Sequence, residues 1–243
     1  MNVTIAAVIT AAGLSRRMTG LKKEYRLLEE WDEQGHPLTV LGKAALAFAS
    51  CKRIDLVVIT VPVDPETGEK AARECIPPGL LADSSRPRVY FVPGGPTRRS
   101  SVHHALTFLE SYTPEYILIH DGARPWLEPL LIDRIIDSVR VHKAVVPLLP
   151  LTDTPKLLDT DGLIRRHIRR AEVGCAQTPQ AFTFPEILRA HEKAAEREER
   201  ENIEYTDDAE VWGEFIGPVA SIPGSAENRK ITFPEDLIAA VPR

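Results

Sequence analysis

Basic side chains gather in residues 13–23 of the chain. This segment holds four cations and no acidic residue: Arg16, Arg17, Lys22 and Lys23. The small residues just before them would let the backbone approach a ligand closely. In a chain of formal net charge −5, such a cluster indicates a polyphosphate site. The patterns G-x-x-x-x-G-K-[ST] and G-x-G-x-x-G do not occur here, which disfavours a P-loop or dinucleotide site. A solvated basic loop is the alternative.

An acidic residue ends an apolar run in the segment HDGARP, residues 120–125. A carboxylate at the end of a buried strand, such as that of Asp121, could hold Mg²⁺ against phosphate oxygens. The alternative is a plain Asp-Gly turn. The seven histidines form no metal-ligand pattern.

Two glycines open a third segment, GGPTRRSSV, residues 94–102. Gly94 and Gly95 permit close approach of a flat ligand such as a nucleotide base. The hydroxyl of Ser101 could bond to that base. The alternative is a loop followed by an N-capped helix. Further polar positions predict ordinary structure when taken alone: a helix cap at Thr206 and Asp207, a turn at Thr178 and a solvated lysine at Lys230.

The elements that must position these residues alternate along the chain. Near-continuous apolar runs predict strands buried on both faces at 5–10, 56–61, 89–92, 116–120 and 144–147. Helices fit between them at 38–50, 66–76, 98–110 and 128–142. The second of these is expected to begin with Asp64 as N-cap and Pro65 in its first turn. This alternation predicts an α/β fold with a mostly parallel sheet flanked by helices, and ligands at the carboxyl ends of the strands.

The pattern changes after residue 147. Residues 148–172 alternate poorly and carry two prolines and a basic run, so we expect them to leave the core as an inserted arm. Helices are expected again at 184–200, 207–212 and 234–240, with a strand at 219–222. We therefore expect one domain over residues 1–243.

Composition narrows the class of protein. The 243 residues are 43% hydrophobic and 27% charged, as in ordinary globular proteins. Three scattered cysteines argue against a disulfide framework or zinc site and indicate a cytoplasmic protein. The longest uncharged apolar stretches are too short to span a bilayer, so no membrane association is expected. The mild acidity argues against nucleic-acid binding.

Taken together, the motifs resemble one family, the 2-C-methyl-D-erythritol 4-phosphate cytidylyltransferases of non-mevalonate isoprenoid biosynthesis. Eight segments match in order from Ala11 to Leu237: AAGLSRRM, KKEY, GGPTRRSSV, HDGARP, LTDTPK, TPQAF, TDDAEVWG and ENRKITFPEDL. The resemblance implies a nucleotidyltransferase-type, Rossmann-like fold with a protruding arm that makes a homodimer. It also implies Mg²⁺-dependent transfer of a cytidylyl group from CTP to the sugar phosphate, with release of pyrophosphate.

The resemblance also implies roles for individual residues. Arg17 and Lys23 are similar to residues that stabilise charge on the α-phosphate, and Arg170 and Lys230 to residues that hold the methylerythritol phosphate. Arg170 lies in the arm and would act on the partner subunit's site. The CTP pocket would include Ala11, Ala12, Gly13, Gly95, Ser101 and Asp121, the last also near Mg²⁺. The second substrate would meet Thr154, Thr178, Thr206 and Asp207.

The sequence departs from the family pattern in three places. Pro96 replaces an acidic residue and offers no backbone N–H, which puts selectivity for cytosine in question. Arg169 stands where the family has Asp; counting back from Thr178 selects Arg170 for the arm role, with Arg169 or Arg166 as alternatives. Gly122 replaces an alanine. Two other functions stay open: a cytidylyltransferase for another polyol phosphate, such as ribitol 5-phosphate, and an inactive nucleotide-binding regulatory protein.

Overall fold

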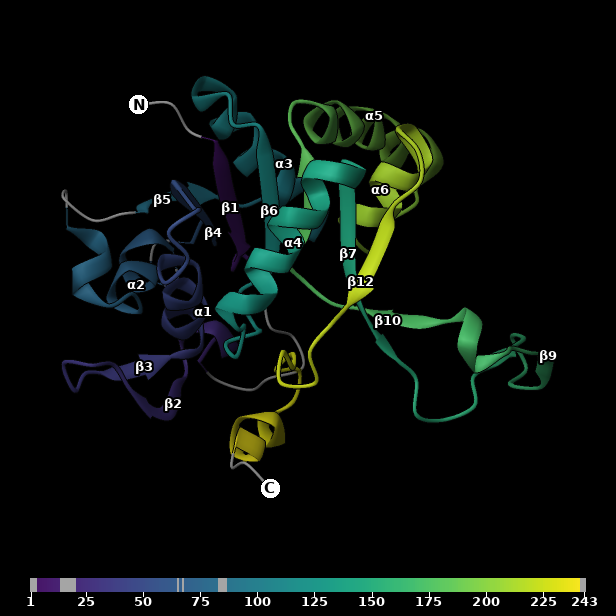
Figure 1. The fold of residues 1–243 in the computed structure, drawn as a ribbon, viewed down its shortest axis with the longest axis horizontal. Helices are drawn as coiled ribbons and strands as arrows, with labels where there is room; N and C mark the ends of the chain where they lie inside the picture. Colours follow the sequence, from purple (N-terminus) through teal and green to yellow (C-terminus); the bar gives the residue numbers. More distant parts are fainter. Residues whose placement is uncertain (1–3, 14–20, 65, 67, 83–86, 241–243) are drawn as a thin grey trace.

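Four runs rich in Val and Ile form a parallel sheet at the centre of the molecule. A computed structural model describes residues 4–13, 21–64, 66, 68–82 and 87–240. Parallel pairing joins the neighbouring strands in the order β6-β1-β4-β5, as Figure 1 shows. Their bounds are Tyr116–Asp121, Ile5–Thr10, Leu56–Val61 and Arg88–Pro93. The predicted α/β class and parallel core are confirmed.

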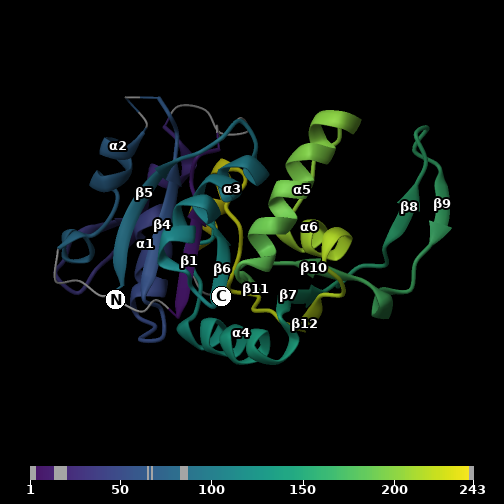
Figure 2. The same ribbon diagram turned by 90° about the horizontal axis from the view of Figure 1, so that it is seen from above.

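Helices cover both faces of this sheet (Figure 2). On one face, alternate β1 residues such as Ile9 pack with α1 (Val40–Ala49) and α4 (Pro129–His142). On the other face, Val8 and its neighbours pack with α3 (Arg98–Leu109), α5 (Glu186–Glu201) and α6 (Asp208–Phe215). Burial on both faces explains why these strands are apolar throughout rather than alternating.

The second half of the sheet is mostly antiparallel. Strand β11 (Gln180–Thr183) inserts between β6 and β7 (Ala144–Pro150) and runs antiparallel to both. The sequence did not predict this strand, because its four residues are too few for a visible period. Thr178, where a turn was expected, lies at a bend just before it. Strands β10 (Gly174–Ala176) and β12 (Ala220–Pro223) both pair with β7 and complete an eight-stranded sheet.

Side-chain caps fix two of the helix starts near the site. Thr97 caps α3 in a reciprocal capping box with Ser100, and Asp207 caps α6 by accepting a hydrogen bond from the Glu210 N–H. The expected start of α2 was wrong: this helix spans Glu69–Glu74, with Gly68 as its N-cap. Asp64 instead accepts a hydrogen bond from the N–H of Glu66, and Pro65 lies outside the described residues.

An arm projects from the sheet between β7 and β10 (Figures 1 and 2). It consists of an antiparallel hairpin of β8 (Lys156–Leu158) and β9 (Ile164–His167), followed by a short 3-10 turn, Arg170–Glu172.

A second hairpin, β2 (Leu27–Trp31) with β3 (Pro37–Thr39), lies at the opposite end of the molecule. The helix expected at 234–240 is a 3-10 helix, Pro234–Ala240. Within the described residues, no helix combines the length and apolarity needed to cross a bilayer.

Candidate functional site

A cavity of about 790 Å³ opens at the carboxyl ends of β1, β4, β5 and β6. Ligands of open α/β sheets bind at this edge because the loops after parallel strands meet there. The cavity walls come from segments far apart in the sequence. They include Ala12 and Gly13 after β1, Lys23, residues 94–98 and Ser101 around the start of α3, Asp121 at the end of β6, and Lys230 with Thr232 near the carboxyl terminus.

Two glycines let the loops on one side of the cavity lie against each other. A Cβ on Gly94 would overlap the methyl group of Ala12, and a Cβ on Gly95 would overlap the side chain of Ser100. The Ser101 hydroxyl accepts a hydrogen bond from the Gly95 N–H at 3.0 Å and donates to Thr97 O at 2.8 Å. Small side chains therefore form this wall of the cavity, and such a wall suits a flat ligand.

Asp121 lies at the centre of the charged part of the cavity. Its Oδ1 is 3.1 Å from Arg98 Nε, and its Oδ2 is 2.8 Å from Lys230 Nζ. Burial opposes ionisation of this carboxyl, but the charges of Arg98 and Lys230 outweigh it and hold the pKa of Asp121 well below its usual range. Asp121 is therefore ionised at neutral pH.

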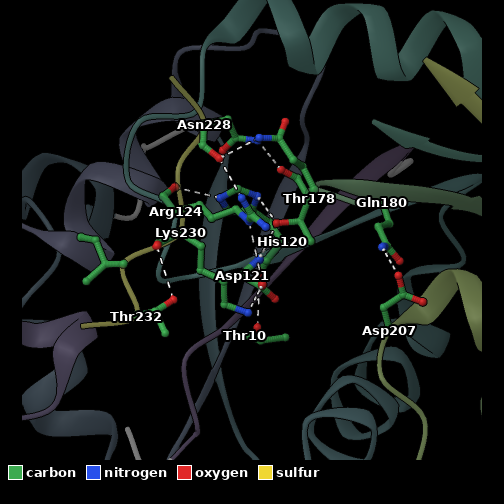
Figure 3. A network of polar contacts seen from close by, with 12 residues as sticks. Thr10, His120, Asp121, Arg124, Thr178, Gln180, Asp207, Asn228, Lys230 and Thr232 are labelled. Carbon is green, nitrogen blue, oxygen red and sulfur yellow. Dashed lines mark hydrogen bonds and ion pairs between the residues drawn. The ribbon is translucent and has the colours of Figure 1, made fainter. Parts of the chain in front are cut away.

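A buried polar network fixes the backbone around Asp121 (Figure 3). His120 Nε2 lies 3.0 Å from the carbonyl oxygen of Arg124, so this nitrogen carries the proton. His120 Nδ1 then accepts from the Thr178 hydroxyl at 3.0 Å, and that hydroxyl oxygen accepts from the Asp121 N–H at 3.0 Å. Burial lowers the pKa of His120 to about 4 and keeps the ring neutral. Thr178 thus lies behind Asp121 and positions its backbone.

The segment that carries Lys230 is tied to the same turn. Asn228 is fully buried, and its side-chain amide donates to Thr178 O at 2.7 Å. The Asn228 carbonyl oxygen accepts from Arg124 Nη1 at 2.7 Å, and the Ile231 N–H donates to Ala123 O at 2.8 Å. Contacts on both sides of Lys230 therefore hold its backbone against the end of β6.

Lys23 enters the cavity from a short 3-10 turn, Lys23–Tyr25. Its Nζ donates to Ile231 O at 3.2 Å. Burial lowers the pKa of Lys23, and the nearby charge of Lys230 lowers it further, while Glu24 and Asp121 act in the opposite direction. The cavity thus presents Lys23 and Lys230 together with the ionised carboxylate of Asp121, and the side chains of Glu24 and Asp64 also line it.

Whether this site can hold Mg²⁺ depends on the oxygen atoms that a bound phosphate would add to those of the protein. Within the described ranges, no three His, Cys, Asp or Glu side chains come together as a metal cage. Asp121 offers one carboxylate, which Arg98 and Lys230 neutralise. Mg²⁺ commonly binds one or two protein carboxylates together with substrate phosphates. The site therefore fits a magnesium ion held largely by phosphate oxygens.

Several expected site residues lie away from the cavity lining. Thr154 and Arg170 lie on the arm, where Arg170 Nη1 donates to Thr152 O at 2.6 Å. Thr206 and Asp207 lie at the start of α6, and the carboxylate of Asp207 accepts from Gln180 Nε2 at 2.8 Å (Figure 3). Ala11 is buried, and its N–H donates to Thr60 O at 3.0 Å. Arg16 and Arg17 lie outside the described residues.

Arg98 and Arg124 both contact Asp121, although neither was expected at the site from the sequence. Arg98 stands in the first turn of a helix that follows a loop after a buried strand, and Arg124 stands three residues after Asp121. Their positions in the sequence could have identified both residues as site candidates, because each basic side chain follows a strand at the sheet edge where ligands bind.

Comparisons with known proteins agree with this geometry. The chain matches the family IspD, 2-C-methyl-D-erythritol 4-phosphate cytidylyltransferase, over residues 5–241. It is 37% identical over 235 residues to the bifunctional enzyme IspD/IspF of Nitrobacter hamburgensis, and 35% identical over 240 residues to that of Brucella anthropi. Each alignment covers 96% of this chain and 53% of the relative, so the chain spans about half the length of these relatives.

Solved structures show the same fold. The crystal structure of 4-diphosphocytidyl-2C-methyl-D-erythritol synthase from Anaerococcus prevotii has a TM-score of 0.76 at 27% identity, covering 99% of this chain and 97% of that one. The 2-C-methyl-D-erythritol 4-phosphate cytidylyltransferase of Thermus thermophilus has a TM-score of 0.68 at 28% identity, with the same coverage. The resemblance noted in the sequence is confirmed: the chain belongs to the 2-C-methyl-D-erythritol 4-phosphate cytidylyltransferase family.

Proposed function

We propose that this chain transfers a cytidylyl group from CTP to 2-C-methyl-D-erythritol 4-phosphate and releases pyrophosphate. The observation that carries the proposal is the cavity itself, in which a narrow wall of small residues adjoins Lys23, Asp121 and Lys230. A flat base fits the narrow wall, and phosphate groups fit the cations. Membership in the family adds independent support.

The proposed reaction needs position and charge more than covalent help from the protein. A phosphate oxygen of the sugar phosphate attacks the α-phosphorus of CTP in line, the bond to the β-phosphate oxygen breaks, and pyrophosphate leaves. Lys23, with Arg17, stabilises the negative charge that builds up on the α-phosphate. Ala12, Gly13, Gly95 and Ser101 line the part of the cavity that would hold the nucleoside, and the buried Ala11 supports this loop from behind. Mg²⁺, held by Asp121 and the phosphates, supplies further neutralising charge when bound.

The second substrate lies on the Lys230 side of the cavity in this proposal. Lys230 binds the phosphate of the sugar, and Thr178 positions the adjoining turn. Thr206 and Asp207 lie outside the cavity lining at the start of α6, and we propose that they meet the part of the second substrate that extends beyond the cavity. Arg170 and Thr154 reach the site from the arm of a second subunit, because in their own subunit they lie on a projecting segment (Figure 2).

The arm supports a homodimer. Four large apolar side chains of the arm are exposed by 44–66%: Leu157, Leu158, Leu163 and Ile164. A second copy that covered this hairpin would remove them from water and would bring Arg170 to the neighbouring site.

We further propose that residues 1–243 act as one catalytic domain with an arm. The free thiols of Cys51, Cys75 and Cys175 are consistent with a reducing, cytoplasmic location.

Pyrophosphate release from CTP with Mg²⁺ tests the proposal directly. The purified chain receives either 2-C-methyl-D-erythritol 4-phosphate or ribitol 5-phosphate as acceptor. Release only with the first acceptor is the expected result. Release only with ribitol 5-phosphate would keep the CTP site and overturn the second substrate. CTP binding without release in either reaction would indicate an inactive regulatory protein.

A further inference from the structure

A chain of ionic contacts runs from the cavity into the helical layer behind it. Arg98, which lines the cavity, bridges two carboxylates: its Nε lies 3.1 Å from Asp121 Oδ1, and its Nη2 lies 2.8 Å from Asp208 Oδ2. Asp208 Oδ1 in turn lies 3.3 Å from His191 Nε2. Asp208 begins α6, and His191 lies on α5.

Asp208 has no access to a ligand. Its side chain is 1% exposed, and it is absent from the cavity lining, whereas Arg98 and Asp121 both reach the cavity. Burial opposes ionisation of Asp208, but the charge of Arg98 and the contact with His191 outweigh it and lower the pKa of this carboxyl. A buried charge of this kind is tolerated only with a partner.

The bridge fixes the orientation of the Asp121 carboxylate. Arg98 Nε occupies Oδ1 of Asp121, so Oδ2 is the oxygen left to face Lys230. Arg98 itself can hold this position because its other edge is anchored on Asp208. The planar guanidinium suits such a double contact, since its donors point in fixed directions.

We propose that Asp208 is a positioning residue for the cytidylyl transfer, acting through Arg98 on the carboxylate of Asp121. The inference rests on the proposed function, because it concerns the same site. Without the anchor, Arg98 keeps one anionic partner and shifts toward Asp121. A displacement of about 1 Å in a catalytic group can cost about 10²-fold in rate.

The test is a double-mutant cycle in the full chain, with kcat and both KM values as readouts. Asp208→Asn is expected to lower kcat by about 10- to 100-fold. It should leave the KM for CTP nearly unchanged, because the wall of small residues that would hold the base stays intact. Arg98→Gln removes both contacts of the bridge. In the Arg98→Gln background, adding Asp208→Asn is expected to change kcat by less than about twofold, since residues that act through one contact are not additive.

The matched control is Glu198→Gln. Glu198 is a mostly buried carboxylate on α5 that pairs with Arg99, the neighbour of Arg98 on α3, at 2.5 Å. This variant removes a comparable buried ion pair within the same helical layer without touching Asp121. It is expected to lower the melting temperature and to leave kcat unchanged. If Asp208→Asn does not fold, Arg98→Lys replaces it, because lysine keeps the charge but cannot reach both carboxylates.

Three results would overturn the assignment. One is a wild-type kcat in Asp208→Asn, or in Arg98→Lys where that variant takes its place. A second is a double variant in which the fold-loss of kcat equals the product of the losses in Asp208→Asn and Arg98→Gln. A third is an equal kcat loss in Glu198→Gln. A wild-type chain that releases no pyrophosphate from CTP and the sugar phosphate would instead overturn the proposed function, and this inference with it.

Discussion

Lys230 Nζ lies 2.8 Å from Asp121 Oδ2, so these two cavity residues neutralise each other in the structure. The Lys230 side chain is 38% exposed, whereas the Asp121 side chain is 10% exposed. Lys230 can therefore swing toward solvent while Asp121 stays fixed by Arg98. The proposed reaction uses this freedom, because Lys230 must exchange the carboxylate for the phosphate of the sugar.

Replacement of this lysine tests that exchange. Lys230→Ala is expected to lower kcat/KM for the sugar phosphate by about 10²- to 10³-fold, the usual cost of a lost preorganised charge contact. The KM for CTP should change little. Lys43→Ala, which removes a lysine paired with Glu30 outside the cavity, is the control. Equal effects of the two variants would contradict the assignment.

The alkaline side of the pH profile tests Lys23. Stabilisation of phosphate charge requires the protonated amine, and burial lowers the pKa of Lys23. As pH rises, Lys23 therefore loses its charge earlier than an exposed lysine, and kcat/KM for CTP should fall with it. Lys23→Arg should move this fall to higher pH, because a guanidinium stays charged up to about pH 12. If kcat/KM for CTP falls at the same alkaline pH in Lys23→Arg as in wild type, the proposed role of Lys23 in stabilising phosphate charge is contradicted.

The central strands could be predicted from the sequence, because they are buried on both faces and appear as unbroken apolar runs. Of the four cations in residues 13–23, Lys23 lines the cavity and Lys22 pairs with Glu24, while Arg16 and Arg17 lie outside the described residues. Strand β11 could not, since four residues give no period and its antiparallel pairing depends on contacts with distant β6 and β7. The positions of Asp121, Lys23 and Lys230 at one cavity follow from topology and family motifs together. The contact of Arg98 with Asp208 requires the first turns of α3 and α6 to meet beside α5, on which both helices pack, and no local pattern encodes this.

Complementation between subunits tests the shared site. Arg170→Ala removes the arm side chain, and Lys230→Ala removes the cavity side chain. If two subunits form each site, co-expression of the two inactive variants creates heterodimers with one intact site and one doubly altered site. The purified heterodimer, isolated through two affinity tags, should therefore show about half of the wild-type kcat. Activity no higher than that of the separate variants would contradict a shared site.

His120 predicts a loss of stability in mild acid. Its pKa is about 4 in the folded chain because of burial, against about 6.5 for an unfolded histidine. Between these values the unfolded chain binds the proton more readily, so the free energy of unfolding falls as pH drops from about 6.5 to 4. The expected loss is about 3 kcal/mol. Urea unfolding of His120→Gln should show a correspondingly shallower pH dependence, whereas His142→Gln, at an exposed position, should match wild type. Equal slopes in all three chains would contradict a buried neutral His120.

Phosphorus NMR of the reaction mixture tests the central claim most directly, because it reports which phosphorus atom is attacked. The wild-type chain is incubated with CTP, Mg²⁺ and 2-C-methyl-D-erythritol 4-phosphate. Attack at the α-phosphorus predicts signals of a pyrophosphate diester and of free pyrophosphate in equal amounts. Appearance of CDP with a newly phosphorylated sugar, or a spectrum of unchanged CTP, would contradict the account.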